Sequence, residues 1–84
     1  FTVSADNVII ETVKPAEDGS GDVIVRMYEA MRTATRCTLV TALPARKAAE
    51  TNLLEVEKLP LQVAQGSIEL EFRPFEIKTI RLSL

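Results

Sequence analysis

The stretch Phe72-Arg73-Pro74-Phe75-Glu76-Ile77-Lys78-Thr79-Ile80-Arg81-Leu82 decides the fold class, because it joins two predicted strands through a proline. From Ile68 to Arg73, apolar and charged side chains alternate, which is the period of a strand with one buried face. Pro74 has no backbone N–H to give to a strand ladder, so we expect the first strand to end there. Both phenylalanines lie on apolar rows and are predicted to be core. The apolar positions then change phase between Thr79 and Ile80, which indicates a β-bulge or a passage between two apolar environments, and we predict a β-bulge.

Similar short strands are expected along the whole chain, and they cover Val8–Val13, Val23–Ala30, Cys37–Leu43, Arg46–Thr51, Leu61–Val63 and Ser67–Phe72. The predicted connections are a loop over Lys14–Asp22, a polar connection over Met31–Arg36, an extended arm over Leu53–Glu57 and a hairpin turn at Gln65-Gly66. The segment 45–58 also has good helix propensity after Pro44, and a helix there is the main alternative.

About seven short strands without a convincing helix predict an all-β fold, an antiparallel β-sandwich of immunoglobulin-like size. With 84 residues, the chain has room for one domain, which we assign to residues 1–84. The first residue is Phe1 rather than methionine. We therefore expect the domain to be a piece of a larger chain.

Composition argues against several classes of partner. Ten Lys and Arg stand against twelve Asp and Glu with the signs mixed, so we expect no nucleic acid partner. The longest uncharged apolar run is Val8–Ile10, far too short for a membrane span. The single cysteine, Cys37, is predicted to be a buried, inert thiol, and it makes a cytoplasmic location the default expectation. The chain has no histidine and therefore little to offer a zinc ion.

Acid–base chemistry has weak candidates, namely the carboxylate pairs Glu69/Glu71, Glu55/Glu57 and Glu17/Asp18. The first two pairs alternate with apolar residues, so a solvated strand face is the favoured interpretation. Glu17, Asp18 and Asp22 offer oxygen atoms in a glycine-containing loop, but their spacing matches no known calcium loop. We expect no catalytic residue, cofactor site or metal site in this segment.

Polar residues set inside or beside apolar elements form the candidate interdomain or ligand surface, and they are Arg26, Tyr28, Glu29, Asn52, Arg73 and Glu76. Two interpretations stay open. These residues form either a surface network with turn chemistry, or a docking face for another domain, where Arg and Tyr are favoured. Tyr28 is the aromatic residue best placed for presentation to a ligand. A self-sufficient carbohydrate-binding module is disfavoured because the chain has no tryptophan.

Four segments resemble the C-terminal β-domain of glycoside hydrolase family 38, the α-mannosidases. They are Asn7–Lys14, Val25–Glu29, Thr51–Glu55 and Arg73–Ile77 with Thr79, Arg81 and Leu82. They occur in the family's order and cover the chain nearly end to end.

This resemblance implies a parent that is a retaining α-mannosidase, with zinc, an aspartate nucleophile and an acid/base residue in a separate N-terminal catalytic region. None of those motifs occurs in this sequence. The expected role is therefore that of a non-catalytic accessory domain, which packs on and stabilises the catalytic region and borders the substrate cleft. Its expected partners are other domains of the same chain and the mannoside substrate of the parent. The alternative is a free-standing immunoglobulin-like module that binds a glycan or a protein.

Overall fold

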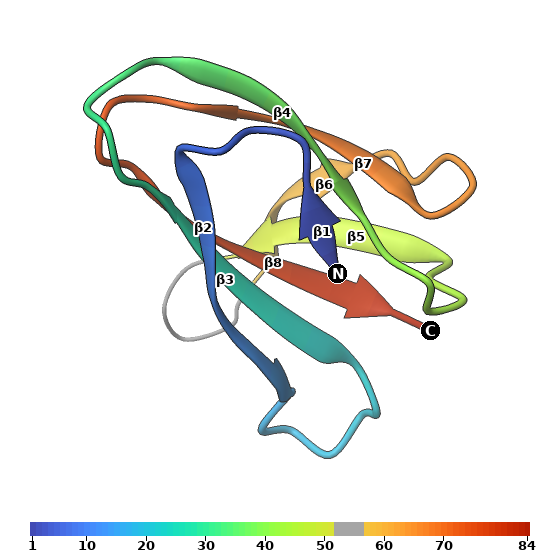
Figure 1. The fold of residues 1–84 in the computed structure, drawn as a ribbon. Coiled ribbons are helices and arrows are strands. Elements are labelled where there is room, and N and C mark those ends of the chain that lie inside the picture. The colour runs from blue at the N-terminus through green and yellow to red at the C-terminus, as the bar shows by residue number, and fades with distance from the viewer. Residues whose placement is uncertain (52–56) are drawn as a thin grey trace.

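The computed structural model of the chain describes residues 1–51 and 57–84, where all the regular secondary structure is β (Figure 1). The strands are β1 (Thr2–Val3), β2 (Val8–Pro15), β3 (Val23–Glu29), β4 (Thr35–Val40), β5 (Lys47–Thr51), β6 (Glu57–Leu61), β7 (Ser67–Phe72) and β8 (Ile77–Ser83). The described residues thus form eight strands where the sequence predicts about seven. The additional strand is β1, which is too short to show a periodicity.

The strands form two sheets packed face to face (Figure 1). The smaller sheet has the order β1-β4-β7, and the larger sheet has the order β2-β3-β8-β5-β6. Every neighbouring pair is antiparallel. The antiparallel β-sandwich predicted from the sequence is confirmed.

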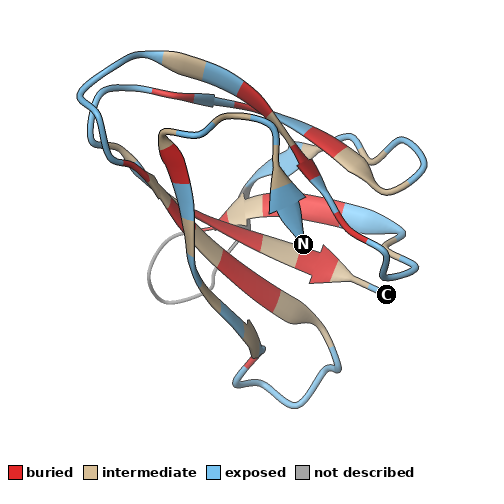
Figure 2. Cartoon of the chain, viewed as in Figure 1, coloured by how far each residue is buried: buried red, intermediate tan, exposed pale blue. Residues whose placement is uncertain are grey.

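The core lies between the sheets, and the buried residues follow β3, β8 and β5 on one side and β4 and β7 on the other (Figure 2). Val25 is paired with Ile80 in the larger sheet, and Leu39 with Ile68 in the smaller one. All four are fully buried. Phe72 joins this cluster, as predicted. Each such side chain contributes roughly 1.5–3 kcal/mol by leaving water.

Cys37 is the buried thiol that the sequence predicts. It lies on β4 with 6% of its surface exposed. Burial raises the pKa of this thiol, so the reactive thiolate is disfavoured.

β8 runs through the larger sheet without a bulge, so the bulge predicted between Thr79 and Ile80 is wrong. Its pairings with β3 and β5 show no shift in register. Thr79 and Ile80 are both buried, at 3% and 0% exposure. Ile80 faces the core, whereas the Thr79 hydroxyl on the outer face accepts a hydrogen bond from Arg26 Nε at 3.5 Å. The phase change marks a central strand that is covered on both faces.

A register shift does occur where β2 pairs with β3. It lies in β2, between Ile10 and Thr12. Glu11 is the extra residue there, and such bulges are common near the edges of sheets.

The predicted edge strand Leu61–Val63 is displaced toward the N-terminus, because β6 spans Glu57–Leu61. Pro60 pairs with Ala49 of β5 inside this strand. β6 is an edge strand of the larger sheet, so one of its sides pairs with no other strand of that sheet. Edge strands are where a sheet tolerates proline, which has no backbone N–H to donate.

Other boundaries also move. The predicted third strand Cys37–Leu43 is β4, which starts at Thr35 inside the predicted polar connection and ends at Val40. The predicted loop over Lys14–Asp22 is shorter, because β2 continues to Pro15. The segment 45–58 contains the predicted strand, as β5, rather than the alternative helix. Most of the predicted arm Leu53–Glu57 lies outside the described residues.

The hairpin turn predicted at Gln65-Gly66 is confirmed. Ala64 and Ser67 exchange two backbone hydrogen bonds of 3.0 Å across it. Both turn residues have positive φ, +52° at Gln65 and +79° at Gly66, which is the geometry of a type I′ turn. Gly66 O also accepts a hydrogen bond from Thr41 N at 2.9 Å, one residue beyond the end of β4.

Candidate functional site

The five candidate residues that the structure describes do not form one continuous surface. Arg26 and Tyr28 lie on the outer face of β3, on the side away from the smaller sheet. Glu29 is buried at the end of the same strand, close to the corner that carries Arg73 and Glu76. Asn52 lies outside the described residues.

Glu29 is a buried carboxylate held by three connections of the chain. With 1% of its surface exposed, it accepts hydrogen bonds from Asn7 Nδ2 at 2.8 Å, Met31 N at 2.7 Å, Thr33 N at 2.9 Å and Phe75 N at 3.0 Å. We call this arrangement the Glu29 clamp. It joins the turn before β2, the connection after β3 and the corner before β8.

Burial of Glu29 by itself raises the pKa of the carboxyl. The bonds from Phe75 N, Asn7, Met31 N and Thr33 N outweigh that effect and lower the pKa from 4.5 to about 2. The side chain is thus a fixed anion near neutral pH, and it has no proton to give as a general acid. Its hydrogen bonds hold the three connections together.

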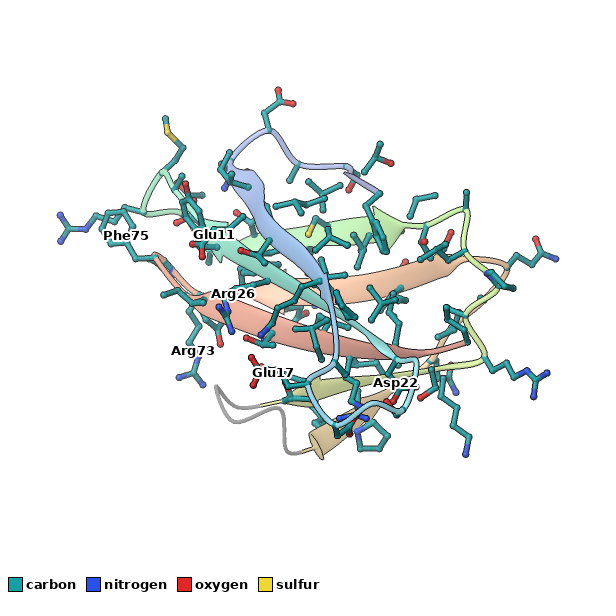
Figure 3. All side chains as sticks on the ribbon, turned by 90° about the horizontal axis from the view of Figure 1, so that it is seen from below. Glu11, Glu17, Asp22, Arg26, Arg73 and Phe75 are labelled. Atoms are coloured by element: carbon teal, nitrogen blue, oxygen red, sulfur yellow. The ribbon has the colours of Figure 1, made fainter. Side chains whose placement is uncertain are left out.

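The corner between β7 and β8 is a tight turn around Pro74 and Phe75. Glu76 N donates to Arg73 O at 3.0 Å, and Arg73 N donates to Glu76 Oε1 at 2.8 Å. β7 ends at Phe72, as predicted from the proline. Figure 3 shows Arg73 and Phe75 at one end of the sandwich and Asp22 at the other.

Phe75 is not a core residue, contrary to the prediction from its apolar row. It is 59% exposed and has φ of +60°, a backbone conformation that bulky residues rarely adopt. Proline followed by a residue with positive φ is the pattern of a type II turn, where glycine is usual. The turn interrupts the strand alternation and directs the ring into solvent. No pattern in the sequence indicates this left-handed conformation.

The outer face of the larger sheet carries an exposed apolar row across three strands. Ile9 of β2 pairs with Tyr28 of β3, and Tyr28 pairs with Ile77 of β8. Directly paired side chains project on the same face, so the three lie side by side. Ile77 is 60% exposed and Ile9 39% exposed. We call these residues the outer row, and its composition, an aromatic ring with aliphatic neighbours beside Arg26, is typical of a protein interface.

At the other end of the same face, Arg81 fixes the loop between β2 and β3. Its guanidinium donates to Asp18 Oδ2 at 2.6 Å, to Asp22 Oδ2 at 2.7 Å and to Ser20 Oγ at 3.0 Å. The bond from Arg81, followed by those from Ser20, lowers the pKa of Asp18 to about 2. All three acids considered for calcium are therefore paired with a cation, since Lys14 Nζ lies 3.3 Å from Glu17 Oε1. In residues 1–51 and 57–84, no three metal-ligating side chains gather.

A groove of about 810 Å³ opens between the edge strands β7 and β6, and we call it the edge groove. Its lining includes the apolar residues Leu59, Leu61, Leu70 and Phe72 and the charged residues Glu50, Glu76 and Lys78. Lys78 Nζ lies 3.1 Å from Glu50 Oε1 and 3.5 Å from Glu76 Oε2. It also lies 5.6 Å from the centre of the Phe72 ring, so the cation is held by two carboxylates and an aromatic face.

Comparison with known families decides what kind of domain this is. The family described as "Glycosyl hydrolases family 38 C-terminal beta sandwich domain" matches residues 7–80. The chain belongs to this family. The resemblance drawn from the four sequence segments is thereby confirmed.

This family-38 domain is similar along its length to curated α-mannosidases. It is 34% identical over 89 residues to "Alpha-mannosidase 2C1" of Mus musculus and 33% identical over 88 residues to "Alpha-mannosidase 2C1" of Homo sapiens. It is 30% identical over 84 residues to "Alpha-mannosidase G" of Dictyostelium discoideum. These alignments cover 96–100% of this chain and 8% of each relative.

In the part of the chain that the structure describes, nothing supports acid–base catalysis by the carboxylate pairs considered from the sequence. Glu69 and Glu71 are exposed on the outer side of β7, as predicted. Glu55 lies outside the described residues. No helix in residues 1–51 and 57–84 has the length and apolar character needed to cross a membrane.

Proposed function

We propose that this chain is a non-catalytic accessory domain of an α-mannosidase that packs on the catalytic region of its parent, stabilises it and borders its substrate cleft. Membership of the family-38 C-terminal β-sandwich domains supports the assignment to such a parent. The exposed outer row is the observation that carries the docking part of the proposal, because an apolar strip of this kind is stabilised when another surface covers it.

The outer row and the Phe75 ring give the proposed interface its anchors. Ile77 and Phe75 are each more than half exposed, at 60% and 59%. Aromatic and large aliphatic side chains enclosed by a partner supply most of the energy of an interface. Arg26, next to the row, supplies a charged group for its margin.

Zinc and the reacting carboxylates are assigned by this proposal to the catalytic region of the parent. The present chain has no histidine and one buried cysteine, so its residues do not fit a zinc site. The mannoside is the proposed substrate of the parent. A cytoplasmic location is likewise a proposal, based on the single cysteine.

The test compares two substitutions of exposed apolar residues in the full parent enzyme and in the 84-residue chain. Ile77→Asp changes the outer row, and Val40→Asp is the matched control, because Val40 is 43% exposed on the outer side of the smaller sheet. In the 84-residue chain both changes should shift the free energy of unfolding by no more than about 0.5 kcal/mol. In the parent, Ile77→Asp should lower the melting temperature by several degrees, because it buries an unpaired charge at an interface.

Equal melting temperatures for the two parent variants would remove the outer row from the proposal. Hydrolysis of a mannoside by the purified 84-residue chain would overturn the non-catalytic role. Saturable mannan binding by the same chain, abolished by Tyr28→Ala, would favour the alternative binding module.

A further inference from the structure

We propose that the free edge of β7 binds an extended polypeptide strand in which basic and apolar residues alternate. This inference rests on the geometry of the smaller sheet and the edge groove. It does not depend on the outer row or on the proposed role in a mannosidase.

The pairing of the hairpin shows which backbone groups of β7 are available. Ser67 exchanges its hydrogen bonds with Ala64, and Gly66 O accepts from Thr41 N at 2.9 Å. Since backbone groups alternate in direction along an antiparallel strand, the even-numbered residues of β7 bond to β4 and the odd-numbered ones point to the free edge. The N–H and C=O groups of Glu69 and Glu71 therefore point away from the sheet. No residue of the described ranges supplies a partner strand there.

The ends of this free edge are closed. Ser67 is occupied by Ala64, and Arg73 N is bonded to the Glu76 side chain. The open length therefore covers Glu69 to Glu71, which offers four backbone hydrogen bonds to an added strand. A short strand is sufficient to occupy it.

Below this edge the sandwich is not closed. Leu59 pairs with Glu50, which pairs in turn with Ile80, so all three project toward the inside of the sandwich. Ile80 is fully buried, but Leu59 is 53% exposed. This inward-facing leucine lines the edge groove, and more than half of its surface is uncovered. A strand added to β7 would place its inward side chains above Leu59 and Leu61.

At the opposite edge of the larger sheet, one inward-facing residue is similarly exposed. The smaller sheet, however, offers no long edge strand on that side. Val13 of β2 faces inward beside Val25 and is 47% exposed. The strand of the smaller sheet on that side is β1, which has two residues. The six-residue β7 is therefore the edge that combines free backbone groups with an open groove.

Charge defines the occupant. Glu69 and Glu71 project outward, and residues paired with them on an added strand would project on the same side. Basic side chains are favoured at those positions. Arg36 pairs with Glu71 at 2.6 Å, but both side chains are mostly exposed, at 86% and 69%, so this bond is easily exchanged. The intervening residue enters the edge groove and is apolar.

A second copy of this chain is a poor occupant. Antiparallel pairing of β7 with β7 of another copy would bring glutamates opposite glutamates, which is destabilising. The occupant is therefore a different segment, with the pattern apolar, basic, apolar, basic, apolar.

The experiment titrates the 84-residue chain with a synthetic peptide of alternating valine and lysine, followed by fluorescence anisotropy and backbone NMR. The control peptides carry glutamate in place of lysine, or N-methyl groups on the edge-facing amides. We expect saturable binding of the lysine peptide, at least tenfold tighter than either control. The amide protons of Glu69 and Glu71 should gain protection from exchange, whereas those of Ile68 and Leu70, already bonded to β4, should not change.

Charge reversal supplies the matched protein variants. The double change Glu69→Lys with Glu71→Lys should invert the preference between the lysine and glutamate peptides. The control double change Asp6→Lys with Glu11→Lys alters the net charge equally at exposed positions away from β7, and it should leave the preference as it was. Equal effects of the two double variants, protection at other amides, or no saturable binding would overturn the proposal.

Discussion

Gly66→Ala tests whether the Gln65-Gly66 hairpin sets the position of β7, and with it the free edge. Gly66 has φ of +79°, and a Cβ atom added there would lie 2.6 Å from Thr41 O. The obstructing atom belongs to the backbone, so it cannot move aside as a flexible side chain would. Thr41 N also donates to Gly66 O at 2.9 Å, so separating the two segments breaks a hydrogen bond.

The expected cost follows from these two contributions. A non-glycine residue in the left-handed region costs roughly 1–2 kcal/mol, and the lost hydrogen bond costs about 1 kcal/mol. The smaller entropy of the unfolded alanine chain returns about 0.4–1 kcal/mol. The net loss is therefore about 2 kcal/mol, a large part of the roughly 4–13 kcal/mol expected for a domain of this size. The melting temperature should fall by about 8–16 °C.

Gly19→Ala is the control, because Gly19 has a similar φ of +75° and nothing within 4 Å of an added Cβ atom. Gly19→Ala should lower the free energy of unfolding by about 1 kcal/mol. This is the cost of alanine in the left-handed region, less the gain from the smaller entropy of the unfolded chain. Both variants are measured by urea unfolding followed by circular dichroism. If they differ by less than about 0.5 kcal/mol, the close contact with Thr41 O does not constrain the hairpin, and the reasoning fails.

Three further predictions concern single side chains. Because the folded-state pKa of Glu29 is about 2 and its ordinary value is 4.5, its stabilising effect is present above about pH 4.5 and is lost as the pH falls toward 2. The urea midpoint of unfolding should fall across that pH window. Glu29→Gln should be less stable at pH 7, and its midpoint should fall less steeply with decreasing pH. Parallel pH curves for the two chains would exclude Glu29 as the source of this pH dependence. Cys37 should react with a thiol reagent at least about tenfold more slowly in the folded chain than in urea, and equal rates would contradict its burial. Phe75→Asn should leave the 84-residue chain as stable or up to about 1 kcal/mol more stable, since Asn tolerates positive φ; a clear loss of thermal stability would show that the ring packs on the domain.

The sequence predicts the parts of this fold that depend on local period and turn chemistry. Alternation from Ile68 to Phe72 identifies β7, and Gln65-Gly66 identifies the hairpin before it, because both signals lie within a few neighbouring residues. The phase change at Thr79 predicts a bulge when the strand is considered alone, because a strand that is covered on both faces looks irregular in sequence. Only the arrangement of five strands shows that β8 is central.

The candidate site was harder to predict for a related reason. In the sequence, Glu29 is a polar residue next to an apolar strand, but its hydrogen bonds come from Asn7, Met31, Thr33 and Phe75, which lie on three separate connections. No spacing in the sequence encodes such a set. Arg26 and Tyr28 lie on the same side of β3 because strand alternation alone determines that side.

The Glu29 clamp connects the two surfaces on which the proposals rest. β7 carries the free edge and belongs to the smaller sheet, whereas β8 carries Ile77 of the outer row and belongs to the larger sheet. The two strands are joined by the corner at Pro74, and Glu29 holds that corner through Phe75 N, while Glu29 N donates to Glu76 O at 3.0 Å. The buried carboxylate resists being pulled out, because its removal would break four hydrogen bonds at once. The clamp therefore fixes the angle between the free edge and the outer row, so an added strand and a docked domain would be held in one relative orientation.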